Sequence, residues 1–327
     1  MVPFVDRGLV SIQRQSKDSS SKLSQFLDAY LPHCTSVTDA WRQSLNAPSW
    51  AGPELEGGWD NLGCALELRI GLDLARQPAP WSLLSYLPAD QCVALLTAVG
   101  FEHARVGPLP DSGTADPALQ HWSRAWNPHN ATDEAQRNAL ALCLDLVEMR
   151  DLAHKWGETC AVEERRSWFL AIIEQGRLGG DVQLLDALTH TWDGYLRHGR
   201  DALGALGERV VVAPEFGHGF GVGDLVVGCT VVDVKVTRDP TSHLDQWLRQ
   251  LLGYVLLDRG DALHLDGVAV YTGVQAQLLT CPLTELLRAA SPGPTPQLSA
   301  LREEFYATVQ DDLDSFVAWT QRRRYSR

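Results

Sequence analysis

Two acids and a lysine interrupt an otherwise apolar stretch of sequence between positions 223 and 235. Asp224 opens the stretch, and Asp233 and Lys235 stand two residues apart near its end. Alternate residues of a strand point to the same face, so we expect Asp233 and Lys235 to share one face and the neighbouring valines to take the other. Charged side chains in such strands are costly to bury unless they pair or bind a cation.

These three side chains suit a divalent-cation site. Carboxylate oxygens are the ligands that Mg²⁺ or Mn²⁺ prefers, and these cations usually keep several waters and bind substrate phosphate as well. A water activated there beside Lys235 would attack a phosphodiester. The alternative is an ordinary ion pair between Asp233 and Lys235, because Asp-x-Lys is a common tripeptide.

The helix that we predict next along the chain, from about Ser242 to Leu257, adds three polar residues at helical spacing. Gln246, Gln250 and Tyr254 fall four apart and line one face of this helix. Such a stripe can orient a water, a metal ligand or a scissile phosphate.

The order of these residues resembles the RecB-like branch of the PD-(D/E)XK nucleases over residues 208–283. The matching positions are Asp224, then Asp233 and Lys235, then Gln250 and Tyr254. The resemblance implies that the two acids hold the catalytic metal, that the lysine supports the attacking water, and that the glutamine and tyrosine organise the site or the DNA. It also implies an α/β fold with a restriction-endonuclease-like mixed β-sheet core flanked by helices.

An upstream acid often completes such a metal site. Glu215, after the first predicted strand, and Glu67, in the helical region, are the two candidates, and Glu215 stands nearer the motif. Some RecB-like nucleases also hold an iron-sulfur cluster with C-terminal cysteines. Only Cys281 follows Tyr254, so we expect no cluster here.

The sequence divides into three expected regions. Residues 1–206 form a mainly helical region for substrate selection or partner docking, 207–290 the nuclease-like core, and 291–327 a linker and a C-terminal helix. In the first region we expect amphipathic helices after Thr132, around Trp168 and around Leu184. In the core we expect strands at about 209–214, 224–228, 230–237, 266–273 and 275–281.

Composition bears on the hydrophobic core, on membrane association and on nucleic-acid binding. The 327 residues are 45% apolar, enough to build a core, and no run of roughly 18 apolar residues suggests a membrane span. We expect no membrane association and a cytoplasmic location. The formal charge of −13 opposes loose binding to a phosphate backbone, although an enzyme needs only a local basic groove.

The leading hypothesis is a Mg²⁺- or Mn²⁺-dependent deoxyribonuclease, and the resemblance suggests restriction, anti-phage defence or DNA repair as its setting. The alternative is a catalytically inactive nuclease-like module that binds nucleic acid or a partner protein in a multi-component complex. In a third hypothesis the chain is a helical interaction protein whose acids are structural.

Overall fold

The computed structural model describes residues 11–45, 50–74, 101–103, 122–124, 133–156, 167, 171–172, 174–175 and 179–325. The chain forms two compact units. The first, called the sheet unit, combines Met1–Pro48 with Asp201–Arg327, and the second comprises Ser49–Arg200. None of the helices in the described ranges is both long and apolar enough to cross a membrane.

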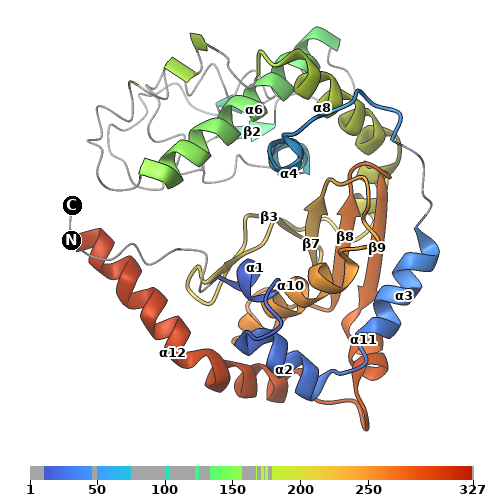
Figure 1. The fold of residues 1–327 in the computed structure, drawn as a ribbon, viewed down its shortest axis with the longest axis vertical. Coiled ribbons are helices and arrows are strands. Elements are labelled where there is room, and N and C mark those ends of the chain that lie inside the picture. The colour runs from blue at the N-terminus through green and yellow to red at the C-terminus, as the bar shows by residue number, and fades with distance from the viewer. Residues whose placement is uncertain are drawn as a thin grey trace. The chain divides into compact units, whose positions relative to one another are not determined.

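A five-stranded mixed sheet lies at the centre of the sheet unit (Figure 1). Its strand order is β3-β6-β7-β8-β9, in which β7 and β8 are parallel and the other neighbours are antiparallel. The strands are β3 (Val210–Val212), β6 (Leu225–Val227), β7 (Thr230–Lys235), β8 (Gly267–Thr272) and β9 (Gln277–Pro282). The predicted α/β class is therefore confirmed.

A tight turn at Gly228 and Cys229 joins β6 to β7. Gly228 has a φ of 60°, and a Cβ atom there would lie 2.1 Å from the carbonyl oxygen of Leu206. Only glycine adopts this conformation without strain and leaves room for the neighbouring backbone. The turn fixes the register in which Val227 faces Thr230.

Helix α10 (Leu244–Leu257) connects β7 to its parallel neighbour β8 and packs against both strands (Figure 1). Every residue from Leu251 to Leu257 is buried. Seven consecutive buried residues place every side of this C-terminal half in the interior of the unit. Helices α1, α2, α3 and α12 accordingly contact α10 from other directions.

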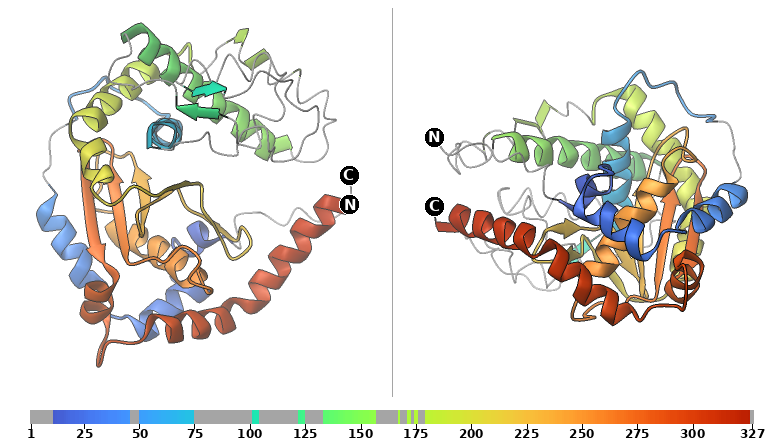
Figure 2. Two further views of the ribbon diagram at one scale, coloured as in Figure 1. Left: turned by 180° about the vertical axis from the view of Figure 1, so that it is seen from behind. Right: turned by 60° about the horizontal axis from the view of Figure 1, so that its bottom comes forward.

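Helices from both ends of the chain pack around α10 or beside the sheet. They are α1 (Ile12–Gln15), α2 (Lys22–Tyr30), α3 (Thr35–Ser44), α11 (Leu283–Ala290) and α12 (Leu298–Tyr325). Helix α2 packs against α12, and α3 packs against α10, α11 and β9 (Figure 2). The first three helices thus share the core of the sheet, although the sequence analysis grouped them with the rest of residues 1–206.

The second unit is built mainly from helices. Its long helices are α4 (Trp59–Leu74), α6 (Asp133–Trp156) and α8 (Val182–Gly194), and each packs against the other two. A π-helical turn, η6 (Tyr195–Gly199), and α9 (Arg200–Gly204) follow α8. The unit also contains the short antiparallel pair β1 (Phe101–His103) and β2 (Trp122–Arg124), which the sequence analysis did not predict. The helices expected after Thr132 and around Leu184 are present, whereas the stretch around Trp168 lies mostly outside the described residues.

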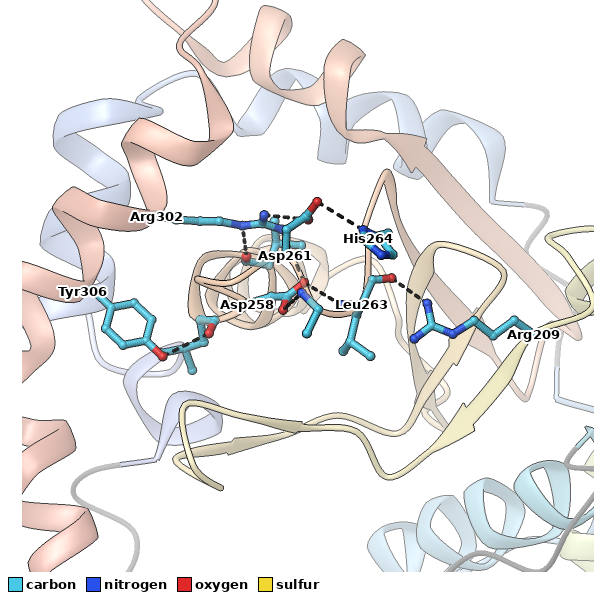
Figure 3. Close-up of polar contacts among 10 residues, drawn as sticks. Arg209, Asp258, Asp261, Leu263, His264, Arg302 and Tyr306 are labelled. Atoms are coloured by element: carbon cyan, nitrogen blue, oxygen red, sulfur yellow. Dashed lines mark hydrogen bonds and ion pairs between the residues drawn. The ribbon is translucent and has the colours of Figure 1, made fainter.

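Arg302 of α12 ties the end of α10 to the loop that leads into β8 (Figure 3). Its side chain is buried; its Nε donates to the carbonyl oxygen of Val255 at 3.0 Å and its Nη1 to Asp261 Oδ1 at 2.7 Å. Its Nη2 lies 3.6 Å from Asp258 Oδ2. The Arg302 guanidinium lowers the pKa of Asp261, and the two buried partners, Arg302 and Asp258, hold the loop.

We predict that Arg302→Ala lowers the free energy of unfolding by about 3–5 kcal/mol, because it leaves the buried Asp258 carboxylate without its cation. Urea unfolding at pH 7 measures the change. Arg259→Ala is the control. This exposed arginine pairs with Glu303 of α12 on the surface, so its removal should change the free energy of unfolding little. Equal losses in the two variants would contradict the role given to Arg302.

A buried acid gives the second unit a pH dependence. Asp145 of α6 accepts a hydrogen bond from the Gly179 N–H at 3.0 Å, and burial raises the pKa of its carboxyl from 3.8 to about 6. The neutral carboxyl is easier to bury, so this contribution to stability is full below pH 3.8 and is lost as the pH rises through 6.

Asp145→Asn stays neutral and can still accept from Gly179. We therefore expect its stability relative to the wild type to rise by about 1–2 kcal/mol between pH 4 and pH 7. Urea unfolding of both proteins across this range gives the difference. Parallel pH profiles would show that Asp145 titrates in the folded protein as it does in the unfolded chain.

Candidate functional site

Asp233 is a charged residue in the interior of the sheet unit. Its side chain is 0% exposed, and it lies on the same face of β7 as the core residue Val231. Gln250 of α10, itself buried, donates a hydrogen bond from Nε2 to Asp233 Oδ1 at 3.1 Å. Helix α10 therefore covers the acid and supplies a hydrogen bond to one of its oxygens.

The second oxygen of Asp233 is held only by charge. Lys235 Nζ lies 2.7 Å from Asp233 Oδ2, but this ion pair lacks the geometry of a hydrogen bond, and Oδ2 accepts none from the described residues. The side chain of Lys235 is 26% exposed. The ammonium group thus stands between a buried carboxylate oxygen and solvent.

A chain of hydrogen bonds fixes the orientation of Gln250. Its Nε2 also donates to the hydroxyl of Tyr254 at 2.8 Å, and this hydroxyl donates to the carbonyl oxygen of Val222 at 2.9 Å. The Tyr254 ring stacks on Phe216, with centroids 5.1 Å apart and an interplanar angle of 17°. Packing and hydrogen bonding together leave little freedom at Asp233.

The short hairpin β4 (Glu215–Phe216) and β5 (Gly221–Val222) supplies the last link of this chain. A Cβ atom at Gly221 would lie 3.1 Å from the Tyr254 ring, so a glycine lets the hairpin approach the ring closely. Gln13 of α1 reaches the same carbonyl group, donating from Nε2 to Val222 O at 2.7 Å. Sequence reasoning missed Phe216, Val222 and Gln13; no local signal marks a carbonyl acceptor or a partner more than 200 residues away.

Asp224 lies beside this network at the end of β6. The β6–β7 register pairs Leu225 with Val232, and the next step places Asp224 beside Asp233. Asp224 Oδ2 accepts a hydrogen bond from the Val234 N–H at 2.6 Å. One oxygen of Asp224 therefore satisfies the backbone of β7 where its ladder with β6 has ended.

The two candidate upstream acids, Glu215 and Glu67, do not join this cluster of residues in the sheet unit. Glu215 is an exposed residue of β4, where its neighbour Phe216 takes the buried side. Glu67 is part of α4 in the second unit and does not belong to the sheet unit. In the ranges that the structure describes, no three His, Cys, Asp or Glu side chains form a group able to hold a metal ion. The expected third acidic ligand is therefore not found among these residues.

Five of the eight residues singled out from the sequence come together on the sheet and α10. They are Asp224, Asp233, Lys235, Gln250 and Tyr254. The arrangement can place a cation or a phosphate oxygen beside a buried carboxylate and an ammonium group.

Comparisons with known proteins add no further assignment. No family model, no curated protein and no solved structure matches the chain. The chemistry of this site therefore follows from its own residues.

We predict that Gln250→Leu lowers the free energy of unfolding by about 1–3 kcal/mol, since the buried Asp233 Oδ1 loses its hydrogen-bond donor while the helix keeps an apolar side chain of similar volume. The matched control is Gln246→Leu, one turn earlier on α10 and half-buried. Urea unfolding compares the two variants. If they are equally stable, Gln250 does not hold Asp233.

Proposed function

We propose that the sheet unit is a divalent-cation-dependent phosphodiesterase that cleaves DNA, a nuclease with the restriction-endonuclease-like core of the RecB-like PD-(D/E)XK type. The observation that carries the proposal is the gathering of Asp224, Asp233, Lys235 and Gln250 at one place on the sheet. A buried carboxylate oxygen without a hydrogen bond is costly in a purely structural ion pair.

Asp224 and Asp233 are the residues that would hold Mg²⁺ or Mn²⁺. Asp233 Oδ2, which accepts no hydrogen bond from the described residues, fits a ligand atom, and Asp224 adds a second carboxylate beside it. Two carboxylates suffice for such cations, which fill their remaining positions with water and substrate phosphate. When bound, the cation supplies Lewis-acid stabilisation of the negative charge that develops on the phosphate.

The other residues position and neutralise charge. Lys235 is close to Asp233 yet partly exposed, so its ammonium group can hold an attacking water or a phosphate oxygen arriving from solution. Gln250 and Tyr254 keep the Asp233 carboxylate in one orientation through the hydrogen bonds that end at Val222. Such fixed groups need little rearrangement when the substrate binds.

A second candidate function is a catalytically inactive module that binds nucleic acid or a partner protein within a larger complex. Two observations favour it. The described residues supply no third acidic ligand, and the direct contact of Lys235 with Asp233 is also what an ordinary ion pair would show. The formal charge of −13 opposes tight binding of a polyanion, which within this alternative favours a protein partner over nucleic acid.

One assay separates the two functions. The full chain is incubated with linear and with circular DNA in Mg²⁺, in Mn²⁺ or in EDTA, and DNA binding is measured by gel shift on the same preparation. The nuclease should cleave only with a cation present. DNA binding or partner binding without cleavage under any of these conditions would favour the inactive module, and linear against circular substrate distinguishes exonuclease from endonuclease action.

We predict that Lys235→Ala lowers the cleavage rate by ~10²–10⁴-fold, the effect typical of losing an acid-base group, while the protein still folds and binds the cation. Lys17→Ala, which removes an exposed lysine of the same unit, is the control and should cleave like the wild type. Cleavage time courses and thermal melting with and without Mg²⁺ are recorded for both.

A contrary outcome is equally clear. If Lys235 only neutralises Asp233, its removal leaves a buried carboxylate unpaired, and the main effect is a lower melting temperature. Unchanged cleavage by a folded Lys235→Ala protein would end the proposed role of the lysine. Raising Mn²⁺ should partly rescue Asp233→Asn, which weakens cation binding, but not Lys235→Ala.

A further inference from the structure

Arg69 of α4 is a buried cation in the middle of the second unit. Its side chain is 0% exposed, and Nε, Nη1 and Nη2 have no hydrogen-bond acceptor in the described part of the chain. Helix α4 packs there against α6 and α8 (Figure 1). An arginine carries five N–H donors, so this is a large unmet hydrogen-bonding capacity inside a helical core.

Among the described residues, no carboxylate contacts Arg69 directly. The Arg69 guanidinium lies over the ring of Trp192 of α8, with the ring centroid 4.3 Å from Cζ. Burial raises the pKa of the nearby Cys143 thiol to about 12, so this thiol stays neutral at pH 7. Burial likewise lowers the pKa of Arg69 itself.

The nearest carboxylate already serves another arginine. Asp73 lies one turn further along α4, and its Oδ2 accepts hydrogen bonds from the Tyr195 hydroxyl and from Arg200 Nε, each at 2.8 Å. No ion pair forms between Arg69 and Asp73 within 4.0 Å. Two arginines therefore stand near a single described carboxylate.

A buried guanidinium without a hydrogen-bond acceptor lowers the stability of the second unit, unless an external group supplies that acceptor. Replacing a buried ion by an apolar side chain of similar size is often neutral or stabilising, because a buried charge must be desolvated. Buried donors in folded proteins are nearly always satisfied. Since Trp192 packs on a face of the guanidinium, an acceptor would have to lie at its edge, where the N–H groups point.

We propose that Arg69 is the anchor of a binding site for a small oxyanion, a phosphate or carboxylate group, in the second unit. The planar fork of an arginine matches two oxygens of such a group and binds them with charge-assisted hydrogen bonds. The anion provides the acceptor and the negative charge together. Because Arg69 is fully covered, the anion enters through a local opening of the helices, and binding and stability are coupled.

The full-length chain is titrated with inorganic phosphate by calorimetry at constant ionic strength, with sulfate and acetate as further oxyanions and chloride as the reference. We expect saturable binding of at least one oxyanion and a melting temperature raised by roughly 5–10 °C at a hundredfold excess over Kd. Acetate binding without phosphate binding would identify a carboxylate site, and the reverse a phosphate site.

Arg69→Met keeps an apolar stem of similar length without the charge. It should bind the anion at least tenfold more weakly and, in oxyanion-free buffer, melt no lower than the wild type. Arg197→Met is the matched control: Arg197 is an exposed arginine of η6 in the same unit, and its loss should leave anion binding unchanged.

Three results would overturn the proposal. The first is the absence of saturable binding by all three oxyanions in the wild type. The second is equal binding by Arg69→Met. The third is an Arg69→Met protein that is unfolded or clearly less stable in oxyanion-free buffer, which would show that Arg69 has a structural acceptor within the chain.

Discussion

Burial of the Asp233 carboxylate beneath α10 constrains the rest of the sheet unit. A fully buried carboxylate requires hydrogen bonds or charge partners, and Gln250 supplies the hydrogen bond to Oδ1. Gln250 is oriented by Tyr254, whose hydroxyl is anchored on the Val222 carbonyl, and Gln13 of α1 binds the same carbonyl. The central sheet, the central helix, the β4–β5 hairpin and the N-terminal helix are thus linked through one buried charge.

The parts of this arrangement that depend on local spacing could be predicted from the sequence. Residues two apart in a strand share a face, so Asp233 and Lys235 meet, and residues four apart in a helix share a face, so Gln250 and Tyr254 meet. Gly228 between two apolar runs likewise indicates the turn that joins β6 to β7. Helix α11 could also have been predicted from the sequence, because its apolar residues recur at helical spacing; they are Leu283, Leu286, Leu287 and Ala290.

Contacts between distant segments could not be predicted in this way. The strands of the β4–β5 hairpin are two residues long, too short for an alternating pattern, and its glycine-rich turn has the composition of a loop. The packing of α1, α2 and α3 on α10 and α12 depends on residues more than 200 positions away, and their helical periodicity does not identify their partner. Closeness to the motif in the sequence likewise favoured Glu215, but in β4 the side chain of Glu215 is exposed while Phe216 is buried.

Three buried charges illustrate how hydrogen bonding separates structural from functional groups. Arg302 donates hydrogen bonds from two of its three nitrogens, to Val255 and Asp261. Its third nitrogen makes no hydrogen bond in the described residues, but the Asp258 carboxylate lies 3.6 Å away, so the charge of this structural residue is neutralised inside the unit. Asp233 has a hydrogen bond to only one of its two oxygens. Gln250 donates to Oδ1, whereas among the described residues Oδ2 has only the ion pair with Lys235. The Arg69 guanidinium packs on the Trp192 ring, and none of its nitrogens finds a hydrogen-bond acceptor among the described residues. An unsatisfied buried charge destabilises the fold that holds it, and the two proposals therefore place an external ion at the unmet hydrogen-bonding positions of Asp233 and Arg69.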